Sequence, residues 1–249
     1  MPETADPSGA PPAARVIAID GPAACGKSTV VRLLAARLGA LSFSSGLVYR
    51  AVTWLALERG LDPADPSAVG RVLAATPVEI AERSGVLRVL VAGRDPGDAL
   101  HGTRVTEAIH WIADDAGLRA ALLPLQRRLP PRRVVAEGRD LGTVVFPDAA
   151  VKVFLTASLE ERARRRHAEL SGRLGERISL DVVAEQLRRR DDNDANRAVA
   201  PLRPAPDARV VDTTDRTPEE VVEEIVEWVP PSWRAPDRNP PGGRPRGGR

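Results

Sequence analysis

An eight-residue loop near the start of the chain has the residue types that hold a polyphosphate. Its sequence, GPAACGKS at 21–28, matches G-x-x-x-x-G-K-[ST] at every fixed position. The glycines let the backbone curl so that its N–H groups point at phosphate, Lys27 can reach the terminal phosphates, and the Ser28 hydroxyl can bind Mg²⁺. The alternative is a glycine turn ahead of an ordinary helix. The expected phosphate-binding residues are Gly21, Pro22, Ala23, Ala24, Cys25, Gly26, Lys27, Ser28 and Thr29.

A second cluster of charged residues directly follows an apolar run at 134–136. In an open parallel sheet the carboxyl ends of the strands border the ligand site, so Glu137 is placed to hold a water of Mg²⁺. The planar fork of Arg139 can grip a phosphate, and Asp140 can accept hydrogen bonds from an exocyclic amine. The alternative is a charged turn in which Arg139 and Asp140 pair on the surface.

Four arginines fall within five residues of a helical pattern at 159–170. Arg162, Arg165 and Arg166 share one helix face by their spacing. Such crowded cations repel one another unless an anion lies over them, which indicates a closing lid that brings arginines to a transferring phosphoryl group. The alternative is a solvated face paired with neighbouring glutamates. A further charged cluster at 190–197 could serve a sugar and a phosphate, or merely end a helix.

Strand and helix signals alternate along the body of the chain, as in an α/β protein with a parallel sheet and helices on both faces. Strands are expected at 16–19, 40–43, 134–136, 151–155 and 209–212, and helices at 29–38, 46–59, 105–114, 118–129, 159–170, 180–191 and 218–229. The stretch 64–100 interrupts this alternation with a hairpin signal around Arg83-Ser84-Gly85, so we expect an inserted lobe there. We expect a helical lid at about 158–195.

Composition favours one large domain. The chain has 249 residues, 43% of them apolar, and only 3% aromatic. No apolar run approaches the ~18 residues of a membrane span, and the first residues lack a signal pattern, so we expect a cytosolic protein with no membrane partner. Cys25 is the only cysteine, which excludes an internal disulfide. We interpret it as a small filler of the loop rather than a redox-sensitive thiol.

The net charge of +2 arises in the tails. Residues 230–249 hold five arginines and one aspartate, whereas residues 1–14 hold two acids, so the body 15–229 is neutral. We therefore expect no specific nucleic-acid partner. Both tails have a composition that cannot build a core, and we expect them to be disordered and removable without loss of stability. Trp233 is the tail residue best suited to dock on the body.

From about residue 15 to 229 the chain resembles the bacterial-type cytidylate kinases, which are nucleoside monophosphate kinases. The matching motifs are IAIDGP at 17–22, SGLVYR at 45–50, EGRDLGTVVFPDA at 137–149, RDD at 190–192 and NRAVAPL at 196–202. The run at 137–149 is long and specific to that family. The resemblance implies a P-loop NTPase three-layer fold with a nucleotide-binding lobe and a lid. It also implies MgATP-dependent phosphorylation of CMP and dCMP in pyrimidine nucleotide metabolism. We expect the protein to be a monomer.

The resemblance further implies a role for each matching residue, with ATP held by the loop at 21–29. The residues implied at the acceptor are Ser45 and Asp140 on the cytosine, Arg50, Arg139 and Arg197 on the phosphate, and Arg190 and Asp194 near the sugar. The catalytic residues implied are Lys27, Arg139, Arg162, Arg165 and Arg166, and the Mg²⁺ residues are Ser28 and Glu137. Phosphoryl transfer needs charge neutralisation and positioning, so no residue has to act as a nucleophile.

The chain departs from the family pattern at two places. Ser44 stands where the family usually has Asp, and His101 stands where it has an Arg that touches the base. Arg104, one turn beyond, offers a substitute, so His101 and Arg104 both remain candidates for base recognition. These departures leave two alternatives open: a related P-loop kinase with a different small-molecule acceptor, or a catalytically weak regulatory nucleotide-binding protein.

Overall fold

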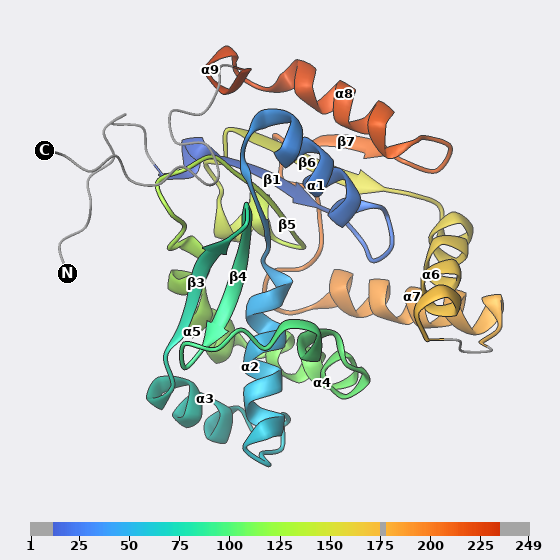
Figure 1. The fold of residues 1–249 in the computed structure, drawn as a ribbon. Coiled ribbons are helices and arrows are strands. Elements are labelled where there is room, and N and C mark those ends of the chain that lie inside the picture. Colours follow the sequence, from blue (N-terminus) through green and yellow to red (C-terminus); the bar gives the residue numbers. More distant parts are fainter. Residues whose placement is uncertain (1–11, 175–177, 235–249) are drawn as a thin grey trace, which may run out of the picture.

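A computed structural model describes residues 12–174 and 178–234, and its centre is one seven-stranded sheet (Figure 1). The strand order is β3-β4-β2-β5-β1-β6-β7, and every neighbouring pair is parallel except the β3–β4 hairpin. The strands are β1 (Val16–Asp20), β2 (Leu41–Ser44), β3 (Val78–Arg83), β4 (Val86–Val91), β5 (Val134–Gly138), β6 (Val151–Thr156) and β7 (Arg209–Asp212). The expected parallel sheet is confirmed.

Alternating side chains of the central strand β1 divide the core into two layers. Val16 and Ala18 join the cluster under one group of helices, whereas Ile17 and Ile19 join the cluster under the other. This is the period of two that a strand buried on both faces requires. Because all five residues of β1 are buried, the segment that leads into the phosphate loop is held in the most enclosed part of the sheet.

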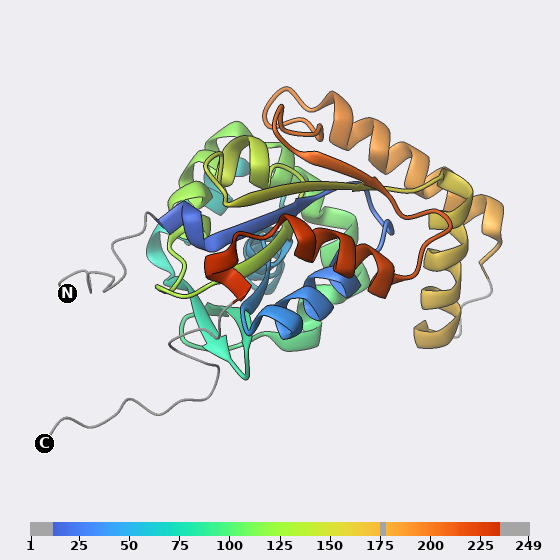
Figure 2. The same cartoon turned by 90° about the horizontal axis from the view of Figure 1, so that it is seen from above.

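Helices cover both faces of the sheet, and a helical pair stands at one end of it (Figures 1 and 2). One face carries α1 (Lys27–Leu38) and α8 (Pro218–Trp228), and the other carries α2 (Gly46–Glu58), α4 (Thr103–Asp114) and α5 (Ala116–Arg127). The pair is α6 (Leu159–Leu174) and α7 (Leu180–Asn196), which packs against Ala23 of the phosphate loop. The expected helices are confirmed, and so is the three-layer α/β architecture.

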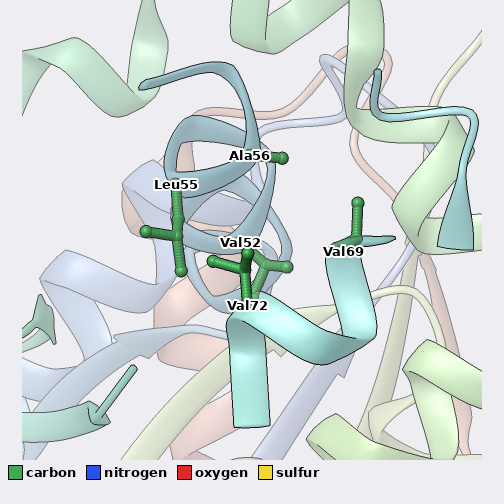
Figure 3. Close-up of a pocket in the computed structure, with 5 residues that line it drawn as sticks. All are labelled: Val52, Leu55, Ala56, Val69 and Val72. Carbon is green, nitrogen blue, oxygen red and sulfur yellow. The ribbon is translucent and has the colours of Figure 1, made fainter. Parts of the chain in front are cut away.

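The stretch 64–100 contains a helix that the sequence analysis did not predict, α3 (Pro66–Ala75). Its signal was present, because Asp65 caps the helix and Pro66 occupies its first position. Helix α3 packs on α2 through aliphatic side chains: Val69 and Val72 face Val52, Leu55 and Ala56, and the space left between them has no room for a water molecule (Figure 3). The hairpin β3–β4 extends the edge of the main sheet beside β2.

The structured part of the chain extends past the expected limit at residue 229. Helix α9 (Pro231–Arg234) follows, and its Trp233 is only 4% exposed. The indole Nε1 donates to the carbonyl of Ala14 at 3.4 Å, and the Arg133 guanidinium lies 5.8 Å from the ring centroid. The expectation of a disordered tail from residue 230 is therefore wrong for 230–234, because Trp233 completes the core under α1 and α8. The expectation for the first tail, 1–14, is likewise wrong for 12–14, which form a short 3-10 helix, Pro12–Arg15. Residues 1–11 and 235–249 lie outside the described residues.

Candidate nucleotide-binding and phosphoryl-transfer site

The phosphate loop connects the carboxyl end of β1 to the amino end of α1 in a shape that two glycines permit. Gly21 has φ 153°, and a Cβ there would lie 2.2 Å from the carbonyl oxygen of Leu155. Gly26 has φ 92° immediately before α1. A side chain would clash with the backbone at Gly21 and would be strained by the positive φ at Gly26. The loop leads directly into α1, whose positive end favours an anion. The expected strand–loop–helix context is confirmed.

Lys27 lies at the centre of this loop. Its ammonium donates a hydrogen bond to the carbonyl of Pro22, and the side chain is buried. Burial lowers its pKa, and the nearby Arg139 lowers it further. The repulsion by Arg139 shows that two cations lie close together here, a situation that an anionic ligand would relieve.

Ser28 and Glu137, the two residues expected at a magnesium ion, face each other. The Ser28 hydroxyl lies 2.9 Å from each carboxylate oxygen of Glu137, although 109 residues separate the two in sequence. The neighbouring strands β1 and β5 bring them together. Within 12–174 and 178–234, no group of three His, Cys, Asp or Glu side chains is arranged to hold a metal ion. Two hard oxygen ligands do fit Mg²⁺, which usually completes its shell with water and phosphate oxygens.

A group of arginines surrounds the turn after β5. Arg139 donates from Nε to Asp194 at 2.9 Å; burial would lower its pKa, but the Asp194 carboxylate outweighs burial and raises it. Arg50 has a lowered pKa because of burial and of repulsion by Arg166 and Arg139. Enclosure by protein atoms and repulsion by Arg139 lower the pKa of Arg190 to about 10, although this side chain keeps contact with solvent. Cations are thus in excess here.

Arg197 adds another guanidinium, and it is unusual in its hydrogen bonding. Its side chain is 6% exposed, and its Nε and Nη2 are buried without a hydrogen-bond partner. The nearest carboxylates, Asp114 and Asp194, each lie 3.9 Å away. Buried donors normally find partners, so this arrangement is suited to an incoming acceptor.

The structure brings a further arginine to Asp140 that sequence reasoning missed. Arg119 on α5 donates from Nη2 to Asp140, and both side chains are buried. Its Nη1 donates to the carbonyl of Ala113 at 2.7 Å, and its guanidinium lies 5.2 Å from the centroid of Tyr49. The alternative interpretation, a surface pair of Arg139 with Asp140, is not what the structure has: Arg139 pairs with Asp194, and Asp140 pairs with Arg119. The sequence did contain a signal for this pair. Arg119 shares the buried face of α5 with Leu122, and a charge buried there without a partner would be costly.

The other expected base-recognition residues differ in exposure. Ser45 is buried, and its hydroxyl donates to the carbonyl of Glu137 at 3.0 Å, two strands from the phosphate loop. His101 and Arg104 are both exposed. The carbonyl of Leu100, next to His101, accepts a hydrogen bond from Arg50 at 2.9 Å. The segment is therefore adjacent to the arginine group, whereas the His101 side chain is open to solvent.

The arginines of α6 divide between the two interpretations of this helix, a lid that brings cations to a phosphoryl group and a solvated face paired with glutamates. Arg162 is buried; it donates to the loop carbonyl of Ala23 at 3.3 Å and pairs with Asp191 at 2.6 Å. Arg164 is the solvated member, paired with glutamates of its own helix. Arg165 and Arg166 also pair with glutamates of α6, at 2.8 and 2.9 Å.

Arg165 in addition lines a hollow of about 290 Å³ beside the phosphate loop, opposite Arg216 and Pro218. Its Nη2 donates to the carbonyl of Thr213 at 2.6 Å. Cys25, at the same place, has a buried side chain, as the filler interpretation expects. The hollow opens next to Gly26, so a ligand on the loop could extend into it.

Asp20 is a second buried charged residue that the sequence analysis did not select. At the end of β1, its two carboxylate oxygens accept hydrogen bonds from the backbone of Leu141 and Gly142 at 2.9 and 2.8 Å. Burial raises its pKa to about 6. Asp20 thereby connects the strand of the phosphate loop to the turn that carries Arg139 and Asp140.

The parallel sheet, the glycine-rich loop with Lys27 and Ser28, and the carboxylate on the adjacent strand define a P-loop NTPase fold. The chain belongs to the cytidylate kinase family, whose model matches residues 17–230. It is 44% identical over 216 residues to a protein named cytidylate kinase from Mycobacterium avium (strain 104), covering 86% of this chain and 94% of the relative. A cytidylate kinase from Geobacillus thermodenitrificans (strain NG80-2) is 45% identical over 214 residues, with coverages of 86% and 95%. One from Carboxydothermus hydrogenoformans is 43% identical over 214 residues, with coverages of 86% and 96%.

Among the described residues, no helix combines the length and apolar character needed to cross a bilayer.

Proposed function

We propose that this protein transfers the terminal phosphoryl group of MgATP to CMP and dCMP, forming ADP and the cytidine diphosphates. The observation that carries the proposal is that a phosphate loop, suited to a donor, and a charged turn, suited to an acceptor, lie side by side at one end of the sheet. The phosphate loop continues β1, and the turn with Arg139 and Asp140 continues the adjacent β5. Family membership supports CMP as the acceptor, and neither a different acceptor nor a regulatory protein is favoured. We expect a monomer that works in the cytoplasm.

On the donor side, the loop N–H groups and Lys27 hold the ATP phosphates, and the hollow between Arg165 and Arg216 accommodates the adenosine. Ser28 and Glu137 would hold Mg²⁺ directly or through water, as their opposed oxygens suggest. The ion supplies neutralisation of phosphate charge when it is bound. Lys27 leaves its contact with the Pro22 carbonyl to meet the phosphates.

On the acceptor side, Arg50, Arg139 and Arg197 hold the CMP phosphate, with Arg190 and Asp194 toward the sugar. The lowered pKa of Arg50 and the unpartnered donors of Arg197 both support an anion at this place. A dianion neutralised by several guanidiniums can approach the donor phosphate, which it would otherwise repel. Arg162, Arg165 and Arg166 approach from α6 to stabilise the transferring group.

For the base, we place recognition on Asp140 and Arg119, with Ser45 beside them. Cytosine presents an amino group and two acceptors along one edge, which match a carboxylate and a guanidinium. Uracil presents a carbonyl where cytosine has the amino group, so a carboxylate would repel it. The burial of Arg119 and Asp140 strengthens this discrimination, because a mismatched buried polar group loses its partner.

The base assignment is tested by comparing kcat/KM for CMP and UMP in three variants. Asp140→Asn, whose amide can pair with either base, is expected to lower the CMP/UMP ratio by about tenfold or more. Arg119→Lys keeps the charge but loses the fork, and should lower kcat/KM for CMP. His101→Arg serves as the comparison at the alternative position. A ratio that responds to His101→Arg and not to Asp140→Asn would move base recognition to the 101–104 segment.

A further inference from the structure

We propose that Asp114, the last residue of α4, is a positioning residue that holds Arg197 ready for the acceptor phosphate. The inference rests on the proposed function and adds a residue outside the motifs at 21–28, 45–50, 137–149 and 190–202. Asp114 touches no reacting atom. It acts through the guanidinium of Arg197.

The first support is the state of Arg197 itself. Its guanidinium is almost fully buried and needs negative charge nearby, yet Nε and Nη2 make no hydrogen bond. Asp114 Oδ1 lies 3.9 Å from Nε, which is close enough for charge compensation and too long for a hydrogen bond. The cation is thus stabilised while its donors stay available for a phosphate.

The second support is that the other carboxylate near Arg197 is already engaged. Asp194 accepts a hydrogen bond from Arg139 at 2.9 Å, and its own pair with Arg197 is 3.9 Å long. Burial would raise the pKa of Asp194, but Arg139 outweighs it and the pKa is lowered. One carboxylate therefore faces two guanidiniums, and Asp114 supplies the missing negative charge.

The third support is the place of Asp114 in the fold. The adjacent carbonyl of Ala113 accepts the hydrogen bond from Arg119, the proposed base-reading residue. The last turn of α4 therefore anchors both Arg119 and Arg197, which come from α5 and from the end of α7. Through this turn, the position of the base and the position of the phosphate are fixed relative to each other.

The charge state of Asp114 depends on groups from three elements. His110 lies one turn earlier on α4, Arg119 faces it from α5, and Arg197 and Asp194 face it from the end of α7. Enclosure by neighbouring protein atoms raises the pKa of Asp114 in spite of the cations around it, although 42% of the side chain is exposed to solvent. When Asp114 takes up a proton, Arg197 loses one of its two counter-charges, and KM for CMP is expected to rise as the pH falls.

The experiment compares the wild type with Asp114→Asn, Asp114→Glu and the control Glu107→Gln, which removes an exposed carboxylate from the same helix. KM for CMP, KM for ATP and kcat are measured from pH 5 to 8, with melting temperatures. Asp114→Asn should raise KM for CMP about threefold to fivefold at pH 7.5, the upper range for a partly exposed charge pair without a hydrogen bond. It should leave KM for ATP and kcat within about twofold and flatten the acid limb of the KM profile. Asp114→Glu should restore most of the CMP affinity, and Glu107→Gln should match the wild type.

Two results would overturn the inference. One is an unchanged KM for CMP in a folded Asp114→Asn variant, and the other is an equal rise in both KM values. If Asp114→Asn melts much lower than the wild type, Asp114→Glu decides: a stable variant that fails to recover CMP affinity also overturns the role. In each of these cases the wild type still phosphorylates CMP. A wild type without that activity would instead refute the proposed function.

Discussion

Arg139 donates a hydrogen bond from Nε to the carboxylate of Asp194 at 2.9 Å, which joins the turn after β5 to the end of α7. Arg139 also lowers the pKa of Lys27 in the phosphate loop and the pKa of Arg50 on α2. A single guanidinium thereby influences both halves of the site. Its contact with Asp194 can be exchanged for a phosphate when an acceptor arrives.

Arg50→Ala and Arg139→Ala are expected to raise KM for CMP more than KM for ATP. Each change removes a guanidinium from the acceptor side, and Arg139→Ala also leaves Asp194 to repel the phosphate. We expect an increase of about tenfold or more in KM for CMP, the size associated with a charged hydrogen bond. Initial-rate measurements with each substrate varied in turn provide the comparison. Equal changes in the two KM values would show that these arginines do not belong to the acceptor half.

Lys27→Ala is expected to keep the fold and lose most of the activity. The Lys27 ammonium donates to groups of its own loop, the Pro22 carbonyl and the Cys25 sulfur, and not to the core of the sheet. Without it the terminal phosphates lose a direct cation in the transition state, which should lower kcat by about 10²-fold or more. A coupled assay of ADP release measures kcat, and a melting curve shows whether the variant is folded. A folded variant with normal turnover is incompatible with the role given to the loop.

Trp233→Ala is expected to destabilise the protein by about 3 kcal/mol or more, the usual cost of deleting a buried Trp side chain. The indole completes the core under α8 and is held by Ala14 and Arg133. Trp111→Ala is the matched control, because Trp111 is 52% exposed. Urea unfolding should separate the two clearly, and a chain ending at residue 229 should lose the same stability as Trp233→Ala. Similar unfolding curves for the two Trp variants would exclude this packing role.

The contribution of Asp20 to the free energy of unfolding is expected to fall as the pH rises. Its pKa is 3.8 in an ordinary environment and about 6 in the folded protein, with burial as the main cause. Between these values the folded state keeps a proton that the unfolded chain has released, so its share of the free energy of unfolding declines with rising pH. The decline is on the order of 3 kcal/mol. The difference in unfolding free energy between wild type and Asp20→Asn should therefore be larger at pH 4 than at pH 7. A pH-independent difference would mean that Asp20 does not titrate in this range.

Local patterns in the sequence were sufficient for much of the fold. The apolar run at 16–19 and the glycines at 21 and 26 each act over a few residues, and each predicted its element correctly. The placement of Ser28 opposite Glu137 followed from the rule that parallel strands end together.

What sequence reasoning missed depends on contacts between distant segments. Arg119 belongs to the site because it donates a hydrogen bond to Asp140. Asp20 belongs to it because its carboxylate accepts hydrogen bonds from the backbone of Leu141 and Gly142. Trp233 was recognised as the tail residue best suited to dock, but the proline and arginine around it indicated a disordered segment, and its burial is decided by α8 and the chain near Ala14. No short-range pattern reports such tertiary partners.

The central claim is that this protein phosphorylates cytidine monophosphates. Release of ADP, followed with MgATP and each nucleoside monophosphate in turn, tests it most directly. The account predicts rapid turnover with CMP and dCMP, and a kcat/KM for UMP, AMP and GMP that is lower by at least about tenfold. Turnover that is negligible with both cytidine nucleotides, or faster with another monophosphate, would contradict it.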